Sequence, residues 1–135
     1  MIGVRLARQL QETGVSWKPG PGDVFTIPDR DLDDETFVLS NMTIEVHDLP
    51  EGRVLGFNGT TEWAMDDVEL DEVLWLPRED QLRDLLGGTF RALHRDDGGY
   101  RVDIELLGTP HTFTAAAPAD AYALAVLHLL RAAVD

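Results

Sequence analysis

The sequence contains no cysteine, one lysine and only two serines among its 135 residues. Without cysteine, disulfide bonds, thiolate catalysis and cysteine-ligated metals are excluded. Ser16 and Ser40 do not lie in a Gly-x-Ser-x-Gly motif, and Lys18 does not lie in a glycine-rich phosphate loop. The sequence therefore favours a protein that is not an enzyme, and we expect no cofactor.

Positive charge is also scarce. The chain has 11 basic and 25 acidic residues, which gives a net charge of −14. Residues 1–76 contain 16 of the acidic residues. Such a chain is repelled by nucleic-acid backbones and anionic lipid, so neither is expected as a partner. No apolar run reaches the ~20 residues of a membrane span, and Arg5 and Arg8 interrupt the segment where a signal peptide needs apolar residues. We expect a cytoplasmic protein.

The pattern of apolar residues predicts an α+β fold in one domain, residues 1–135. Apolar residues at helical spacing predict helices over residues 2–13, 77–86 and 118–133. Six short strands are expected between the first two helices and three between the last two. These strands are expected to form a mainly antiparallel, curved sheet packed with the three helices.

Two hairpins set the expected register of these strands. A loop over residues 49–52 places Val46 opposite Leu55, so that apolar residues share one face. Between Thr89 and Leu107, a two-residue turn would place Leu93 opposite Val102. A three-residue turn would place His94 there instead, with Ala92 opposite Ile104 and Phe90 opposite Leu106. We predict the three-residue turn because it aligns more apolar pairs.

The C-terminal helix is apolar on nearly every side. Its polar positions are confined to Asp120, His128 and Arg131. A helix of this composition is buried on more than one side. It either lies between a sheet and other elements or supplies the contact of a homodimer.

The acidic segment over residues 58–72 is the principal candidate site. It combines an aromatic residue with carboxylates and contains no basic residue. Complementary charge accelerates association with a basic partner. The predicted function is therefore a non-enzymatic binding or regulatory module that contacts a basic protein through Asn58, Trp63, Asp66, Asp67, Glu69, Asp71 and Glu72. The competing interpretation places Trp63 in the core and leaves the acids solvated.

The alternative function is a small enzyme or small-molecule-binding protein with a cleft of histidines and carboxylates. His94 and His111 are predicted on the inner side of neighbouring strands, with Asp96 near. No two histidines have the spacing of a metal pair, so no metal site is predicted. Convergence of both histidines in one cavity is what this alternative requires.

Several segments resemble a group of small acidic actinobacterial proteins of unknown function. The resemblance rests on Trp17-Lys18-Pro19 with Gly22-Asp23, on residues 27–35, on Phe57-Asn58-Gly59-Thr60-Thr61-Glu62-Trp63-Ala64 and on residues 75–82. Some of these proteins carry a pilus-assembly label that comes from an ATPase family. The present chain has no phosphate loop of that kind, so the resemblance implies neither an activity nor site residues.

Overall fold

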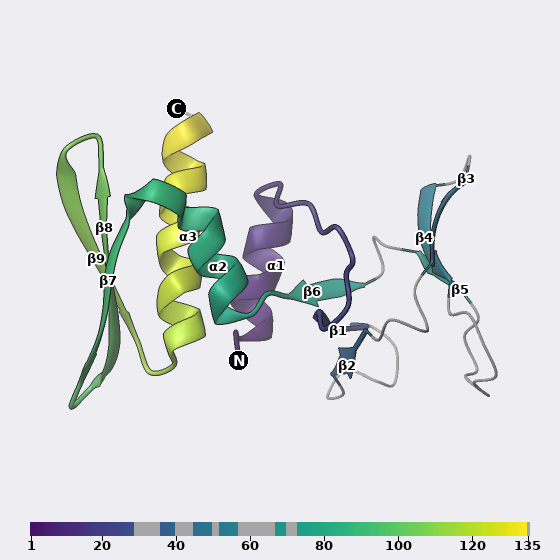
Figure 1. The fold of residues 1–135 in the computed structure, drawn as a ribbon, viewed down its shortest axis with the longest axis horizontal. Coiled ribbons are helices and arrows are strands. Elements are labelled where there is room, and N and C mark those ends of the chain that lie inside the picture. Colours follow the sequence, from purple (N-terminus) through teal and green to yellow (C-terminus); the bar gives the residue numbers. More distant parts are fainter. Residues whose placement is uncertain (29–35, 40–44, 50–51, 57–66, 70–72, 135) are drawn as a thin grey trace. The chain divides into compact units, whose positions relative to one another are not determined.

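The structure is a computed structural model that describes residues 1–28, 36–39, 45–49, 52–56, 67–69 and 73–134. Within these described residues, one α-helix is followed by six strands, a second α-helix, three strands and a last α-helix (Figure 1). This order is the predicted one, and the α+β class is confirmed. The elements are α1 (Val4–Glu12), β1 (Val24–Thr26), β2 (Phe37–Val38), β3 (Glu45–Leu49), β4 (Gly52–Gly56), β5 (Asp67–Glu69), β6 (Leu74–Leu76), α2 (Glu79–Leu86), β7 (Phe90–Asp96), β8 (Gly99–Leu106), β9 (Thr109–Ala115) and α3 (Pro118–Val134).

The chain divides into two compact units. The terminal unit comprises Met1–Val15 and Leu76–Asp135, and the central unit comprises Ser16–Trp75. The described strands form three small sheets, in the orders β2-β1-β6, β3-β4-β5 and β7-β8-β9. The last of these belongs to the terminal unit. One cooperative domain over residues 1–135 stays a prediction, which an unfolding experiment proposed below tests.

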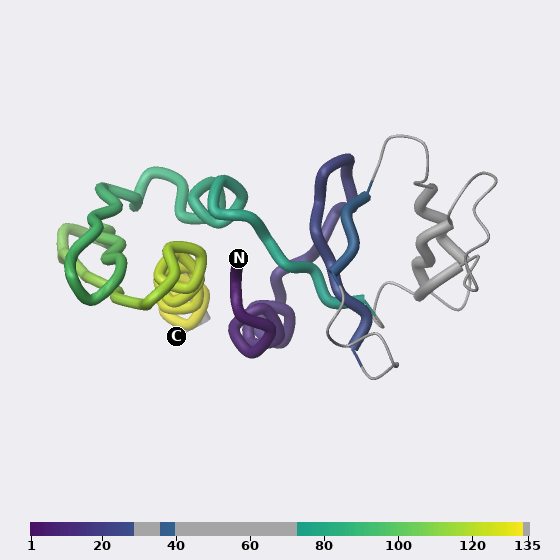
Figure 2. Tube along the Cα trace, turned by 90° about the horizontal axis from the view of Figure 1, so that it is seen from below, coloured from purple at the N-terminus to yellow at the C-terminus, as the bar shows by residue number. Residues whose placement is uncertain are grey.

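Helix α3 is the core of the terminal unit. It packs against β8 and β9 on one side and against α1 and α2 on the other, so that the first and last helices of the chain run side by side (Figure 2). Its buried residues are Ala119, Ala121, Tyr122, Ala123, Ala125, Val126 and Leu127. Of the two alternatives for this apolar helix, the structure thus shows the one in which it lies between a sheet and other helices.

Helices α1 and α2 are shorter than the apolar spacing predicts. Helix α2 starts at Glu79 rather than Pro77, because the side-chain oxygen of Gln81 accepts the Arg78 backbone N–H at 2.9 Å. Gly87 then ends the helix with a φ of 56°, a conformation that costs glycine little. Helix α1 occupies Val4–Glu12, inside its predicted bounds.

The predicted register of the β7–β8 hairpin is wrong. Asp96 pairs with Gly99 across a two-residue turn, and Leu93 lies opposite Val102. The reason is a bulge between Phe90 and Ala92. The extra residue brings Phe90 opposite Ile104. Phe90 and Ile104 therefore both face α3 although the turn has only two residues.

The central unit has a small core rich in aromatic side chains. It consists of Trp17, Phe25, Ile27, Leu39 and Val73, with Phe37 and Trp75 packed against it. The indoles of Trp17 and Trp75 stack at a centroid distance of 6.4 Å and an interplanar angle of 9°.

A buried carboxylate fastens the turn that precedes β1. Asp23 is only 5% exposed, and its Oδ2 accepts the Trp17 indole N–H at 2.9 Å and the Gly20 backbone N–H at 3.0 Å. The irregular segment over residues 17–23 is thereby tied to the core. In the β3-β4-β5 sheet, Val46 pairs with Leu55, which confirms the predicted β3–β4 register.

Candidate functional site

Most of the predicted acidic site lies outside the described residues. This holds for Asn58, Trp63, Asp66, Asp71 and Glu72. The backbone of Asp67 and Glu69 is described, and both residues lie on β5. This strand pairs with β4 and places Asp67 opposite Gly56 and Glu69 opposite Val54. The acidic segment thus contributes a strand of its own. The sequence also predicts a strand over residues 61–65, which lie outside the described residues.

The structure does not bring His94 and His111 together. In an antiparallel sheet, directly opposite residues share a face. His94 lies opposite Arg101, whereas His111 lies opposite Ile104, which is buried on the α3 side. Positions 101 and 104 of β8 lie on opposite faces, so the two histidines do as well. The predicted cleft assumed the other hairpin register, and the correction of that register separates its two residues.

His94 instead belongs to a polar cluster on the outward face of the sheet. Its Nε2 lies 2.9 Å from Asp103 Oδ2, while Arg101 Nε donates to the other oxygen of the same carboxylate at 3.0 Å. The His94 side chain is 46% exposed, so this cluster lies at an open surface.

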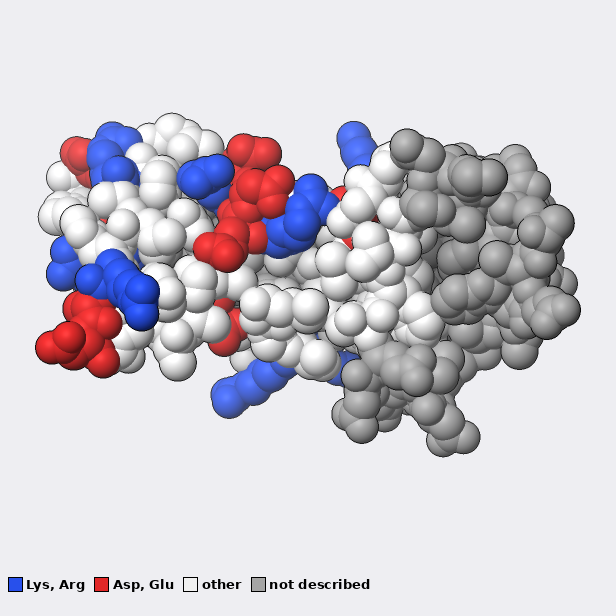
Figure 3. All heavy atoms as spheres, turned by 60° about the horizontal axis from the view of Figure 1, so that its bottom comes forward, with Lys and Arg blue, Asp and Glu red and all other residues white. Residues whose placement is uncertain are grey.

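Ion pairs of this kind recur over the described surface of the terminal unit. Arg91 Nε donates to Glu105 at 3.2 Å, and Arg78 Nε donates to Asp80 at 3.1 Å. The space-filling view shows basic and acidic side chains close together at several places (Figure 3). Asp80, Asp103 and Glu105 are thus each paired with an arginine.

His111 lies in an aromatic contact on the other face of the sheet. Its ring centroid is 4.5 Å from that of His128 on α3, and the Phe113 ring is 5.4 Å from His128. Within the part of the chain that the structure describes, no group of three or more histidine, aspartate or glutamate side chains is placed to hold a metal ion. His111 and His128 form part of the contact between β9 and α3.

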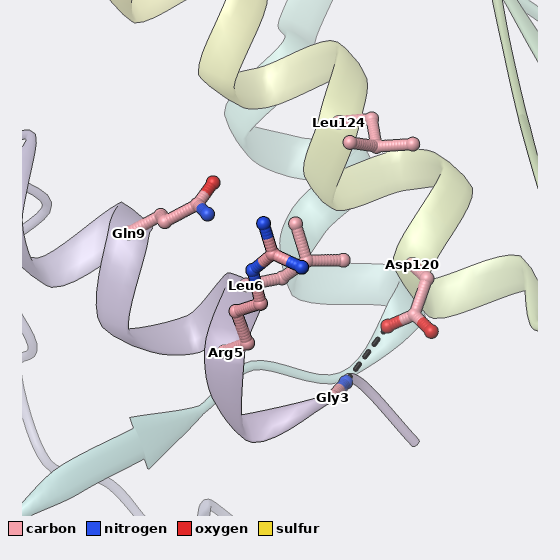
Figure 4. Close-up of a pocket in the computed structure, with 6 residues that line it drawn as sticks. All are labelled: Gly3, Arg5, Leu6, Gln9, Asp120 and Leu124. Carbon is pink, nitrogen blue, oxygen red and sulfur yellow. Dashed lines mark hydrogen bonds between the residues drawn. The ribbon is translucent and has the colours of Figure 1, made fainter.

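A cavity between α1 and α3 was not anticipated from the sequence. It has a volume of about 420 Å³ and is lined by Gly3, Arg5, Leu6, Gln9, Asp120 and Leu124, all from the terminal unit (Figure 4). At its edge, Asp120 Oδ1 accepts the Gly3 backbone N–H at 2.7 Å.

One sequence signal for this cavity existed. The positive end of a helix dipole favours acidic residues, yet the first turn of α1 contains Arg5 and no acid. A cation at this end of a helix is unfavourable unless an anion offsets it. The partner helix α3 could not be matched with α1 from sequence, because 115 positions separate Arg5 from Asp120.

Comparisons with known proteins add no relative. A scan against models of protein families and searches of the curated proteins and of the solved structures find no match to this chain. The resemblance to small acidic actinobacterial proteins therefore stays a prediction. Within the described residues, no helix is both long and apolar enough to cross a membrane.

Proposed function

We propose that the protein is a non-enzymatic, cytoplasmic binding module whose central unit contacts a basic protein. The contact residues are those of the acidic segment: Asn58, Trp63, Asp66, Asp67, Glu69, Asp71 and Glu72. The observation that carries this proposal is the segregation of charge. The central unit holds fifteen acidic and three basic residues, and the terminal unit holds ten and eight.

Charge of one sign at this density has an energetic consequence. Like charges repel and destabilise the compact state that brings them together. A partner of opposite charge relieves this repulsion and also gains speed of association from the complementary field. A basic surface is thus the partner that the central unit favours by its charge.

The small aromatic core supports the same proposal. The Asp23 carboxylate and the stacked pair Trp17 and Trp75 fix the turn before β1 and the strand β6. The acidic segment is followed directly by Val73 and β6, so this core anchors one end of the segment. Anchoring lowers the conformational entropy that a binding segment loses on association.

The experiment compares two variants with the same change in charge. In the first, Asp66, Asp67, Glu69, Asp71 and Glu72 are replaced by Asn or Gln. In the matched control, the same replacement is made at five positions of the terminal unit: Glu12, Glu79, Asp84, Asp97 and Asp135. Proteins captured from an actinobacterial lysate at low salt are purified and titrated by calorimetry against both variants and the unaltered chain.

We expect a basic partner whose affinity falls at least tenfold in the first variant and less than threefold in the control. Trp63→Ala is expected to weaken the complex as well, since buried aromatic residues dominate many interfaces. Equal losses in the two variants would mean that the affinity follows net charge alone. That result, or the capture of no salt-sensitive basic protein, would contradict the proposal.

The predicted homodimer through the C-terminal helix is a separate proposal. Its motive was the apolar surface of that helix, and much of that surface is buried within the chain. A concentration series by light scattering tests it directly. A mass that stays at one chain from low to high concentration would remove it.

A further inference from the structure

The cavity between α1 and α3 has the size and the mixed lining of a small-molecule site. Ligand pockets of proteins have volumes of about 300–1,000 Å³ and combine apolar walls with a few polar groups. Here the volume is about 420 Å³, with Leu6 and Leu124 as apolar residues and Arg5, Gln9 and Asp120 as polar ones. All six lining residues come from one compact unit.

Two polar side chains that point into this cavity have no partner within the described parts of the chain. The Arg5 guanidinium and the Gln9 amide both extend from α1 toward α3 (Figure 4). The ion pairs and side-chain hydrogen bonds of the described residues do not include either group. Both are donors, and a guanidinium binds carboxylates in a bidentate manner.

An acidic group borders the same cavity without neutralising this cation. Among the described residues, no ion pair joins Asp120 to Arg5. One oxygen of Asp120 accepts the Gly3 N–H at 2.7 Å, which fixes the carboxylate at the edge of the cavity. A carboxylate has capacity for further hydrogen bonds, so its negative charge still favours a cationic donor.

The apolar part of the lining completes the description of the ligand. Leu6 and Leu124 are only partly buried, and both line the cavity. Covering such side chains with an aliphatic group removes apolar surface from water. A ligand that matches the whole lining has an anionic group, a cationic group and an aliphatic arm within a few bonds of one another.

We propose that this cavity binds a free α-amino acid with an aliphatic side chain. Its carboxylate binds Arg5 and Gln9, its ammonium group binds Asp120, and its side chain packs on Leu6 and Leu124. The site is independent of the acidic central unit and of the basic partner proposed for it. An internal residue of a peptide lacks both charges, so a free amino acid fits better than a peptide segment.

The experiment uses the full chain and follows backbone amide signals by NMR during titration with L-leucine. We expect saturable shifts at residues of α1 and of the start of α3, with a Kd of about 10 μM to 1 mM, as suits so small a ligand. Two analogues test the two charges. 4-Methylpentanoate lacks the ammonium group and leucinamide lacks the carboxylate, and each should bind at least tenfold more weakly. N-Acetylleucine separates a free amino acid from a peptide terminus and should also lose at least tenfold.

Two variants test the residues. Arg5→Gln should weaken leucine at least tenfold and leave the weak binding of leucinamide unchanged. Asp120→Asn keeps an oxygen that can accept the Gly3 N–H and removes only the charge, so it should weaken leucine but not 4-methylpentanoate. Arg131→Gln, on the same unit and outside the cavity lining, should change affinity less than twofold. No saturable shifts up to roughly 10 mM leucine, or shifts that Arg5→Gln and Asp120→Asn leave unaltered, would overturn the proposal.

Discussion

The two units of the chain balance their charges in different ways. The terminal unit has 75 residues with ten acids and eight bases, and the central unit has 60 residues with fifteen acids and three bases. In the terminal unit, Asp80, Asp103 and Glu105 each bind an arginine. The central unit has too few bases for such pairing. Nearly all of the net charge therefore belongs to one unit, which net charge alone would not reveal.

The cores of the two units differ as well. The terminal unit buries alanine and aliphatic residues around α3, together with Tyr122. The central unit buries stacked aromatic rings and a hydrogen-bonded carboxylate. All three tryptophans (Trp17, Trp63 and Trp75) belong to the central unit, and both tyrosines (Tyr100 and Tyr122) belong to the terminal unit. Tryptophan fluorescence thus reports on one unit and helical circular dichroism chiefly on the other.

The largest effect is expected from Leu82→Ala in the terminal unit. Leu82 is fully buried on α2, which packs on α3. Such a truncation costs about 2–5 kcal/mol because it removes apolar contacts and leaves a cavity. If the chain is one cooperative domain, as the sequence predicts, the tryptophan signal and the helical signal fall together in denaturant.

Leu85→Ala on the same helix is the matched control. Leu85 is 44% exposed, and surface substitutions usually change stability by about 0.5 kcal/mol or less. A tryptophan transition that stays at its original midpoint in Leu82→Ala, while the helical transition moves, would show that the two units unfold independently.

The second-largest effect is a difference in stability between two variants of the central unit, Trp17→Phe and Trp75→Phe. Trp17→Phe removes a donor to a buried carboxylate, whereas the buried indole nitrogen of Trp75 has no hydrogen-bond partner among the described residues. An unsatisfied buried polar group costs about 1–3 kcal/mol. Trp17→Phe leaves Asp23 with one donor fewer, and Trp75→Phe removes an unsatisfied one.

We therefore expect Trp17→Phe to destabilise the protein by at least about 1 kcal/mol more than Trp75→Phe. Denaturant unfolding followed by circular dichroism measures both. Equal losses would mean that stacking area, which both variants reduce, determines stability here.

Salt is expected to act on the two units in opposite directions. Screening weakens the repulsion among the acids of the central unit and also weakens the ion pairs of the terminal unit. Exposed ion pairs contribute little, so the relief of repulsion should dominate. Raising the NaCl concentration from low to moderate should increase the tryptophan-monitored Tm by roughly 2–5 °C, the equivalent of about 1 kcal/mol. A fall in that Tm would contradict the view that repulsion limits the stability of the central unit.

The order of elements follows from the sequence because each element carries its own signal. Apolar residues at helical spacing mark α1, α2 and α3, and alternation marks the β3–β4 hairpin, whose register is as predicted. These signals are local, since they depend on residues a few positions apart. These elements can therefore be predicted without knowledge of the tertiary structure.

The register of β7 and the cavity between α1 and α3 depend on information of another kind. One extra residue between Phe90 and Ala92 decides which face His94 occupies, and a bulge has no strong local pattern. The cavity lies between α1 and α3, which come from opposite ends of the chain and contribute Arg5 and Asp120 to its lining. Sequence reasoning therefore assigned His94 to the wrong face and missed Arg5, Gln9 and Asp120 altogether.

The smallest effect concerns one carboxylate that an arginine stabilises. The hydrogen bond from Arg78 holds the pKa of Asp80 below its ordinary value of 3.8. Because the folded state lowers this pKa, the favourable contribution is present above about pH 4 and is lost as the pH falls through the folded-state value. Arg78→Gln should raise the pKa of Asp80 toward 3.8, as measured by carboxyl-carbon NMR, while Arg131→Gln should leave it unchanged. Helical circular dichroism of Arg78→Gln provides the structural control, since Arg78 also precedes α2. An unaltered pKa in a folded Arg78→Gln variant would show that the arginine does not stabilise this carboxylate in solution. The contrast between paired acids in the terminal unit and unbalanced acids in the central unit would then rest on fewer ion pairs.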